Sequence, residues 1–540
     1  MIGQMMDFQL TINSVMRHGR SLYGNQEIVS VTSDNPLHRY TFEEAFGRVC
    51  QVAGVLADMG LNAGDRVGTL AWNDYRHFEI YYAVSCSELV THTINPRLFP
   101  EQLDFVVNHA EDRVIFVDPT LLPALEAIKD KLTKVERIIV MTSEEHMPDS
   151  SLALECYETL LAGRPTEFTF PEFDEKTASS LCYTSGTTGD PKGVLYSHRS
   201  TVLHAMGGAV PSVFGLTTDD IILPIVPMFH VNAWAIPYAA VMSGTKLVFP
   251  GPKMGDGAAI ADLINAEKVT VSAGVPTVWL AMLNHLRETK QTVETLTRII
   301  VGGAACPQAI MEEMEQAHGV YVHHAWGMTE MSPLGTFNTI KPELSDLPAD
   351  EKMAYRLKQG LPPYGVELDV FDEEGNAQPH DGTSFGSLRV RGPWIASGYF
   401  KLDKEIIDEN GYMDTGDVAV IDEHGYMQIT DRAKDVIKTG GEWISSIDLE
   451  NAAIGHPGVA EACVIGIHHP KWDERPLMLV IAAGEQPSKE ELNAYMSDKV
   501  AKWWLPDDII FVQELPHTAT GKLDKKVLRT QYKGYKLPTA

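Results

Sequence analysis

A chain of 540 residues is longer than one hydrophobic core usually supports, so we expect a large body of two or three subdomains and at least one separable domain. Hydrophobic residues make up 44% and charged residues 22%, the values of an ordinary soluble enzyme. The formal charge of −29 argues against a nucleic-acid binder, which would carry a basic face, so any site for an anionic ligand must be locally basic.

Cysteine usage and the apolar segments indicate a cytoplasmic protein. None of the six cysteines stands in a C-x-x-C pair, which favours reduced, mostly buried thiols. Residues 1–7 lack the basic region and apolar stretch of an export signal. The apolar segment 221–242 imitates a membrane span, but it contains three prolines, His230 and Asn232. We therefore expect no membrane span there, but a buried strand, a turn and a helix that line a pocket.

The first elements of the chain alternate helices with short apolar runs. Thr41 and Glu44 form a capping box that begins a helix, and Gly60 ends it. Residues 65–71 are predicted as a strand and residues 74–86 as a second helix. Continuous apolar runs bounded by polar residues are typical of buried parallel strands between helices. Such runs lie at 114–118, 137–141, 246–249, 270–273 and 298–303.

The pattern changes twice in the second half of the chain. After about Leu361, short alternating strands with glycine turns, such as 366–371, predict a small β subdomain. A charged break at 431–434 precedes about a hundred residues with an α/β pattern of their own, enough for an independent domain. The predicted fold is α/β: a large N-terminal domain, residues 1–431, and a small mobile C-terminal α/β domain, residues 432–540.

Residues 181–194 hold the strongest chemical signal, an apolar segment that runs into a loop of hydroxyl residues, glycines and a lysine. Glycine lets backbone N–H groups approach an anion, the hydroxyls donate hydrogen bonds and the lysine adds positive charge. The common nucleotide loop needs Ser or Thr after its lysine, whereas Gly193 stands here. A flexible surface loop is the alternative, but the density of donors favours phosphate binding. The candidate ligands are Thr184, Ser185, Gly186, Thr187, Thr188, Gly189 and Lys192.

Three further clusters carry residue types suited to a nucleotide. In 323–330 an aromatic ring can stack on a base, and Glu330 offers an oxygen ligand for Mg²⁺. In 412–417 a carboxylate on a glycine turn can accept ribose hydroxyls. In 518–525 a lysine follows a glycine turn just before a basic helix. Each cluster alone has an ordinary explanation: a core aromatic, an Asx turn or a solvated lysine.

Taken together, in this order and at these separations, the clusters resemble one family, the adenylate-forming acyl-CoA synthetases. Residues 227–234 and 438–445 are similar to its medium- and long-chain fatty acyl-CoA ligase branch, and 502–506 to ligases of 3-methylmercaptopropionate. The resemblance implies that a carboxylate attacks the α-phosphorus of ATP to give acyl-AMP and pyrophosphate, and that the CoA thiol then displaces AMP. It thus implies ATP, Mg²⁺, coenzyme A and a small carboxylic acid as cofactors and substrates.

The resemblance also implies a role for each matching residue. Thr184 and Glu330 would hold Mg²⁺, and Asp417 with Arg432 would hold the ribose. Lys522 would lie against the α-phosphate, where negative charge develops, as the catalytic residue of the first step. The other nucleotide-binding residues would be Gly302, Gly303, Ala304, His324, Ala325, Trp326, Gly327 and Thr329. Many relatives have tyrosine where this chain has Trp326, which keeps stacking but loses a phenolic hydrogen bond.

Two more sites follow from the resemblance. His230 would lie at the carboxylate end of the acyl pocket, Gly303 in the pocket and Trp234 at its gate, although a lone histidine or tryptophan in an apolar run is usually a core residue. For thioester formation the small domain would rotate about Lys434. Lys438 would then face the adenylate as a catalytic residue, and the second glycine of 440–441, Gly441, would let pantetheine pass.

Other functions remain open at this point. A medium- or long-chain fatty acid is an alternative substrate. A non-catalytic nucleotide-binding regulator could keep the fold, although the complete residue set speaks against it. A carrier-protein loading enzyme would have to act in trans, because only eighteen residues follow Lys522. Relatives in this branch look like homodimers built through the N-terminal domain.

Overall fold

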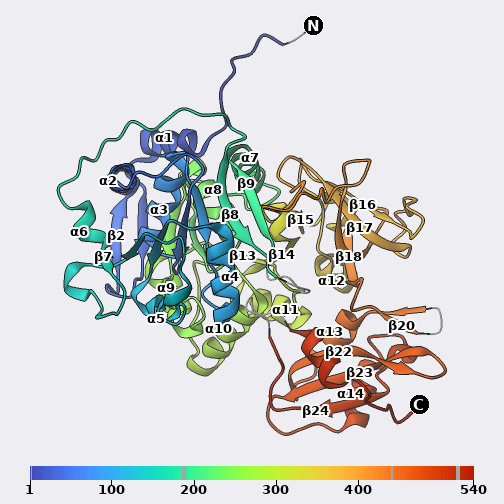
Figure 1. The fold of residues 1–540 in the computed structure, drawn as a ribbon. Coiled ribbons are helices and arrows are strands. Elements are labelled where there is room, and N and C mark those ends of the chain that lie inside the picture. The colour runs from blue at the N-terminus through green and yellow to red at the C-terminus, as the bar shows by residue number, and fades with distance from the viewer. Residues whose placement is uncertain (2, 185–189, 440–441, 518–522) are drawn as a thin grey trace.

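The computed structural model describes residues 1, 3–184, 190–439, 442–517 and 523–540. Within these residues the chain forms four sheets (Figure 1). Two large sheets with their helices build the body that contains the N-terminus, a four-stranded sheet lies beside it, and a five-stranded sheet carries the C-terminus. The α/β fold predicted from the sequence is therefore confirmed.

The first large sheet has seven strands in the order β7-β6-β5-β3-β4-β8-β9. All neighbours are parallel except β8 and β9, which form an antiparallel hairpin. Every residue of β5 is buried, as the continuous apolar run predicted. The strands are β3 Arg66–Leu70, β4 Val90–Thr93, β5 Val114–Val117, β6 Arg137–Val140, β7 Leu154–Cys156, β8 Ala178–Tyr183 and β9 Gly193–Ser197.

The second large sheet has eight strands in the order β15-β14-β13-β12-β10-β11-β1-β2. Its central pairs are parallel and its two edge strands, β2 and β15, are antiparallel. The strands are β1 Glu27–Ser30, β2 His38–Thr41, β10 Ile221–Pro224, β11 Lys246–Phe249, β12 Val271–Gly274, β13 Arg298–Val301, β14 Tyr321–Gly327 and β15 Leu334–Phe337.

Helices fill the space between the two sheets and cover their outer faces. The largest core cluster joins residues of both sheets through α2, α3 and α8, and every residue of α3 is buried. The capping box of α2 is present, because the Thr41 hydroxyl accepts from the Glu44 N–H and the Glu44 carboxylate from the Thr41 N–H. The helices are α1 Ile12–Tyr23, α2 Phe42–Asp58, α3 Tyr75–Cys86, α4 Pro100–Ala110, α5 Leu122–Glu126, α6 Tyr157–Leu161, α7 His198–Ala209, α8 Ile236–Ser243, α9 Gly257–Glu267, α10 Pro276–Thr289, α11 Gln308–His318 and α12 Ala349–Leu357.

The second half of the chain adds the β subdomain and the C-terminal sheet. The β subdomain is an antiparallel sheet in the order β16-β17-β18-β19, and β24 joins the C-terminal sheet by pairing with β23. A hydrogen bond from the Ser446 N–H to Asp431 Oδ2 (2.6 Å) links the two parts. The elements are β16 Glu367–Phe371, β17 Phe385–Arg391, β18 Met413–Ile421, β19 Met427–Arg432, β20 Ile437–Thr439, β21 Glu442–Ile444, α13 Ser446–Ile454, β22 Val459–His469, β23 Asp473–Ala482, α14 Lys489–Met496, β24 Asp508–Phe511 and α15 Lys525–Gln531.

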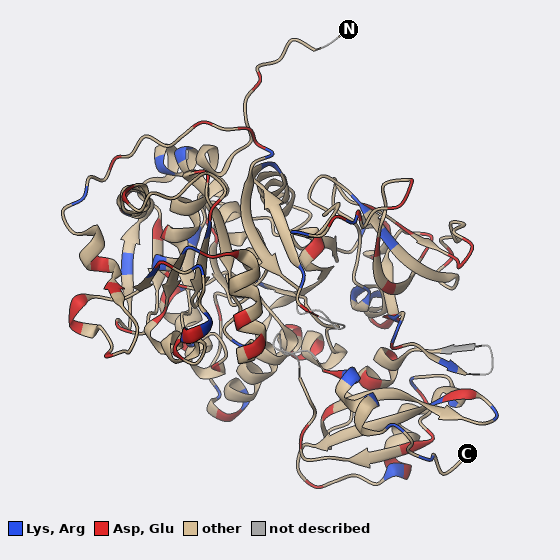
Figure 2. Ribbon diagram, in the orientation of Figure 1, with Lys and Arg blue, Asp and Glu red and all other residues tan. Residues whose placement is uncertain are grey.

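The apolar segment 221–242 folds as predicted, into strand β10, a helical turn at Val231–Ala235 and helix α8. In the described part of the chain, no helix combines the length and apolar character that crossing a membrane requires. All six cysteines are buried and free. Acidic residues are spread over the N-terminal body, the β subdomain and the C-terminal sheet (Figure 2).

Candidate functional site

The predicted site residues follow the carboxyl ends of four strands in the two large sheets. Thr184 follows β8, His230 lies beyond β10, Gly302 follows β13, and Trp326 lies near the end of β14. Ligands of open α/β sheets bind beyond the carboxyl ends of the strands. The fold thus places residues drawn from a stretch of chain that runs from Thr184 to Trp326 at equivalent strand ends.

The β8–β9 hairpin carries the predicted phosphate loop. The Thr184 N–H donates to the Lys192 carbonyl at 2.8 Å, which closes the base of the loop. The Lys192 ammonium is exposed and lies 4.9 Å from the centre of the Tyr399 ring. Ser185, Gly186, Thr187, Thr188 and Gly189 lie outside the described residues.

Glu330 is held beside this hairpin by two tyrosines. Its carboxylate Oε1 accepts a hydrogen bond from the Tyr399 hydroxyl at 2.7 Å, and its side chain is buried. Tyr196, on β9, donates its hydroxyl to the Thr329 carbonyl at 2.6 Å. Tyr399 therefore stands between Lys192 and Glu330 and contacts both. Neither Tyr399 nor Tyr196 is predicted from the sequence, because neither residue stands in a motif that marks it.

The donor set suits Mg²⁺. This ion prefers oxygen ligands and is usually bound by one or two carboxylates together with substrate phosphates. Glu330 would supply a carboxylate, and the Tyr399 hydrogen bond orients that carboxylate as outer-shell partners orient metal ligands. Thr184 supplies a hydroxyl at the base of the phosphate loop.

Asp417 joins the β subdomain to the large sheet. The β18–β19 pairing sets Asp417 opposite Arg432, whose Nε lies 3.4 Å from Asp417 Oδ1. The indole Nε1 of Trp326 donates to Asp417 Oδ2 at 3.1 Å. The structure thus brings together three predicted nucleotide residues, and the indole N–H of Trp326 supplies a hydrogen bond to one of them.

The Gly302–Ala304 segment lies against Trp234 and β14. A Cβ atom at Gly302 would lie 2.9 Å from the Trp234 ring and 3.1 Å from the Ala325 carbonyl oxygen, so glycine is required there. Gly303 has a φ of +81°, which also favours glycine. The ring of His324 is buried, donates from Nδ1 to the Leu357 carbonyl (3.0 Å) and accepts at Nε2 from the Cys306 N–H (3.3 Å).

These contacts define the chemical state of His324. Burial lowers its pKa to about 4, so the ring is neutral at pH 7 with its proton on Nδ1. Both ring nitrogens are used within the protein, so His324 supports the 302–306 segment rather than offering a proton to a ligand. Of the other predicted residues here, Gly327 packs against Pro333, where a Cβ would meet the Pro333 carbonyl oxygen at 1.8 Å.

The turn that follows His230 has an unusual backbone. The five residues Val231–Ala235 all have positive φ values, between 48° and 57°. For residues other than glycine this conformation costs roughly 1–2 kcal/mol each, so surrounding contacts must hold it. Val231 and Ala233 are buried, whereas His230 and Trp234 are half-buried. The sequence predicted a turn here but not its left-handed conformation.

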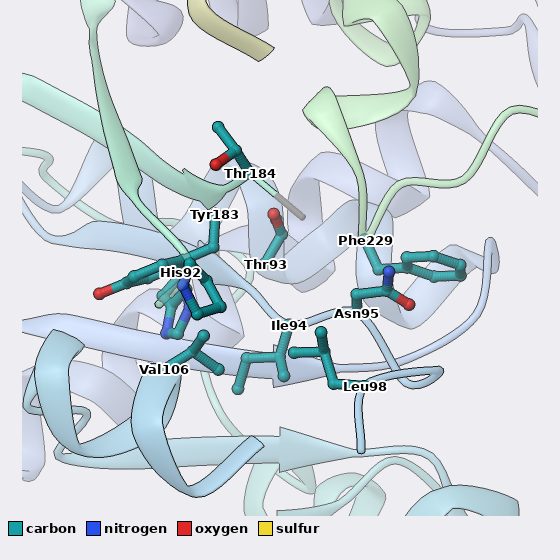
Figure 3. A pocket seen from close by; sticks show the side chains of 10 residues that line it. His92, Thr93, Ile94, Asn95, Leu98, Val106, Tyr183, Thr184 and Phe229 are labelled. Carbon is teal, nitrogen blue, oxygen red and sulfur yellow. The ribbon is translucent and has the colours of Figure 1, made fainter. Parts of the chain in front are cut away.

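A small cavity lies below the base of the phosphate loop. Its volume is about 10 Å³, the lower limit for one water molecule. Figure 3 shows Thr184 at the top of the side chains that line it and the apolar Ile94 and Leu98 at the bottom. Tyr183, also in the lining, shares a 2.7 Å hydrogen bond between its hydroxyl and His109 Nδ1, which braces the strand that leads to Thr184.

The C-terminal candidates lie around the junction of the two parts. Burial, together with Arg432 and Arg529, lowers the pKa of Lys434 to about 8. Lys438 is exposed on β20, and its N–H donates to Glu474 Oε2 at 3.1 Å. Gly441 and Lys522 lie outside the described residues, and the helix predicted after Lys522 is α15.

Comparison with known protein families identifies the family of this chain. Residues 21–400 match the AMP-binding enzyme family, and residues 448–522 match the AMP-binding enzyme C-terminal domain. The chain belongs to the AMP-binding enzyme family. As a member of this family it is an ATP-dependent, AMP-forming acid–CoA ligase that uses ATP, Mg²⁺ and coenzyme A.

Relatives of this AMP-binding enzyme span its whole length. It is 49% identical to a 3-methylmercaptopropionyl-CoA ligase of Ruegeria lacuscaerulensis, with 99% of both chains covered. It is 48% identical to a medium-chain-fatty-acid–CoA ligase of Ectopseudomonas oleovorans, with 98% of both covered. Among solved structures, the anthranilate CoA ligase AuaEII in complex with anthranoyl-AMP superposes with a TM-score of 0.87 at 25% identity and 98% coverage of both chains.

The Trp326 hydrogen bond gives a testable expectation for this AMP-binding enzyme. Trp326→Phe keeps an aromatic ring but removes the donor to Asp417, so we expect the KM for ATP to rise about fivefold to tenfold. The KM for the acid should change less than about twofold. Trp326→Tyr is the matched control, because it restores a hydroxyl donor. Equal ATP KM values for the wild type and the Phe variant would contradict the role of this hydrogen bond.

Proposed function

We propose that this acid–CoA ligase activates 3-methylmercaptopropionate and related short- and medium-chain fatty acids. The observation that carries the proposal is the 49% identity, over 99% of both chains, to a ligase named for that acid. The sequence of the acyl turn supports an apolar acid, since residues 230–238 contain no carboxylate that could pair a substrate ammonium. Medium-chain fatty acids are the second candidate, because the ligase named for them is 48% identical.

In the first step, different residues around the site would bind the phosphates, the ribose and the substrate carboxylate. Thr184 to Lys192 would hold the β- and γ-phosphates, with Glu330 and Thr184 as ligands of Mg²⁺, which neutralises phosphate charge when bound. Asp417 and Arg432 would hold the ribose, which suits their pairing across β18 and β19. His230 would lie near the substrate carboxylate, and Lys522 near the α-phosphate. This chemistry needs positioning and charge neutralisation rather than a covalent nucleophile.

The second step would use another face of the C-terminal part. We place the domains at 1–431 and 432–540, with the hinge at Lys434, directly after β19 ends at Arg432. Rotation there would withdraw Lys522 and bring Lys438 to the adenylate and Gly441 to the pantetheine path. The linker is short and polar, and two hydrogen bonds lie beside it: one from the Ser446 N–H to Asp431 Oδ2 and one from the Ser445 hydroxyl to the Thr430 carbonyl.

We also propose that the enzyme works as a homodimer in the cytoplasm. Apolar side chains are exposed around the N-terminus and α1, namely Met5, Met6, Phe8 and Leu22. A second copy packed on this region would bury them. The six buried free thiols suit a reducing compartment, where ATP and coenzyme A are also found. Light scattering on purified protein measures the mass, and a monomer at micromolar concentration would reject the dimer.

A panel of acids tests the substrate. We expect the highest kcat/KM with 3-methylmercaptopropionate, and a value within about tenfold for pentanoate, which replaces the sulfur with a methylene. Straight chains of about twelve or more carbons should be at least about tenfold poorer. The measurement follows acyl-CoA formation with ATP, Mg²⁺ and CoA. A clear preference for the long chains would reject the proposed acid, and no pyrophosphate release with any acid would reject the ligase assignment.

A further inference from the structure

The left-handed turn Val231–Ala235 is hydrogen-bonded to strand β8 through the side chain of Asn232. Its Nδ2 donates to the Ser180 hydroxyl at 2.8 Å, and its Oδ1 accepts from the Cys182 thiol at 3.5 Å. All three side chains are buried. Ser180 and Cys182 are two residues apart on one strand and therefore point to the same face of the sheet. Asn232 thus bridges two adjacent positions of β8.

The residue before Asn232 strengthens this attachment. Val231 packs in one apolar cluster with Cys182 of β8 and with Val194 and Tyr196 of β9. Strands β8 and β9 form the hairpin that carries the predicted phosphate loop, which we call the phosphate hairpin, and Cys182 is two residues before Thr184. The turn therefore lies directly on the hairpin that we expect to grip the pyrophosphate end of ATP.

The residues on either side of Asn232 belong to the acyl site. Trp234 is two residues later, and its ring lies against Gly302 at the end of β13. His230 is two residues earlier. Because the turn is only five residues long and each of them has positive φ, a shift of Asn232 would move both side chains. Asn232 thus lies where its conformation would set the positions of both side chains.

We propose that Asn232 is a positioning residue that fastens the left-handed turn to β8 and so fixes Trp234 and His230 relative to the phosphate hairpin. Asparagine suits both demands of this position. It tolerates positive φ better than most residues. Its amide offers one donor and one acceptor, which match a hydroxyl and a thiol on the strand. The inference rests on the acyl site proposed above.

The experiment separates the side-chain tether from the backbone preference. Asn232→Ala removes both, whereas Asn232→Gly removes the tether but allows positive φ. Ser180→Ala removes one hydrogen-bonding partner from the strand side. Ser179→Ala is the matched control: Ser179 is a buried serine on the same strand, and its hydroxyl bonds Tyr196 and Thr201 instead of the turn. Each variant is assayed as the full chain by pyrophosphate release, with its thermal midpoint measured.

We expect the Asn232 variants to change the KM for the acid but not the KM for ATP. In Asn232→Ala and Asn232→Gly the KM for the acid should rise about tenfold, equivalent to about 1.4 kcal/mol, with the KM for ATP within about twofold. The preference among acid chain lengths should also flatten. Ser180→Ala should raise the acid KM by about threefold, and the Ser180→Ala/Asn232→Ala double variant should be no worse than Asn232→Ala alone. Ser179→Ala should leave both KM values unchanged.

Three results would overturn the inference. A wild-type acid KM in Asn232→Gly would mean that only the backbone preference matters. Multiplying effects in the double variant would mean that Asn232 and Ser180 act independently. If Asn232→Ala does not fold, Ser180→Ala alone decides, because an unchanged acid KM there rejects the tether. A wild-type preference for long chains with the Asn232 effect intact would reject the proposed acid and leave this inference standing.

Discussion

Replacing Lys522 with alanine should lower the rate of acyl-AMP formation about a thousandfold and leave thioester formation from supplied acyl-AMP within a few-fold of wild type. The reason is the charge that develops on the α-phosphate when the carboxylate attacks. A cation placed there stabilises the transition state more than the ground state, so its loss lowers kcat rather than only raising KM. Pyrophosphate release measures the first step, and CoA-dependent AMP release from acyl-AMP measures the second.

The described residues on both sides of Lys522 support this expectation. His517 pairs with Leu523 across the intervening segment, and α15 begins at Lys525. Lys525 forms a 2.7 Å ion pair with Glu450 of α13. Burial alone would lower the pKa of Lys525, but the nearby negative charges, chiefly Glu450 and Asp431, together outweigh it and raise the pKa. The described residues that flank Lys522 are thus tied to the C-terminal part of the chain. Lys533→Ala, an exposed lysine beyond α15, is the control, and equal loss of both half-reactions would contradict the hinge assignment.

Local patterns were sufficient to predict the elements of the fold. The continuous apolar runs became β5, β6, β11, β12 and β13, because a strand buried on both faces needs apolar residues at every position. The order of the strands could not be predicted in the same way. β1 lies between β11 and β2, and its pairing with β11 joins residues more than two hundred positions apart. Such pairings depend on packing between distant segments, which no local period records.

In the candidate site, too, the residues could be predicted from the sequence but the contacts between them could not. Residue types marked the clusters around Thr184, Glu330, Trp326 and Asp417 as suited to phosphate, metal, base and ribose, and the resemblance of the whole set to one family assigned each residue its expected role. The contacts that join them were not predictable. Trp326 and Asp417 are 91 residues apart, and Tyr399 and Glu330 are 69 apart. Nothing near Tyr399 in the sequence distinguishes it from a core aromatic, so its place between Lys192 and Glu330 emerges only from the fold.

Replacing Glu330 with glutamine should have the second largest effect, a fall of about a hundredfold in kcat/KM for acyl-AMP formation. Glutamine keeps the size of the side chain, and its carbonyl can still accept from the Tyr399 hydroxyl. Only the negative charge is lost, so the fall would measure the electrostatic attraction for Mg²⁺ rather than a change of packing. The concentration of Mg²⁺ at half-maximal pyrophosphate release should rise about tenfold.

Tyr399→Phe tests the geometry of the same carboxylate without removing its charge. The variant keeps the ring beneath Lys192 but deletes the hydrogen bond to Glu330 Oε1. The half-maximal Mg²⁺ concentration should rise only about threefold, because an outer-shell partner orients the ligand but does not replace it. If Glu330→Gln left the Mg²⁺ dependence unchanged, Glu330 would not be a metal ligand. If Tyr399→Phe raised the half-maximal Mg²⁺ concentration as much as Glu330→Gln does, the orientation of the carboxylate would matter as much as its charge.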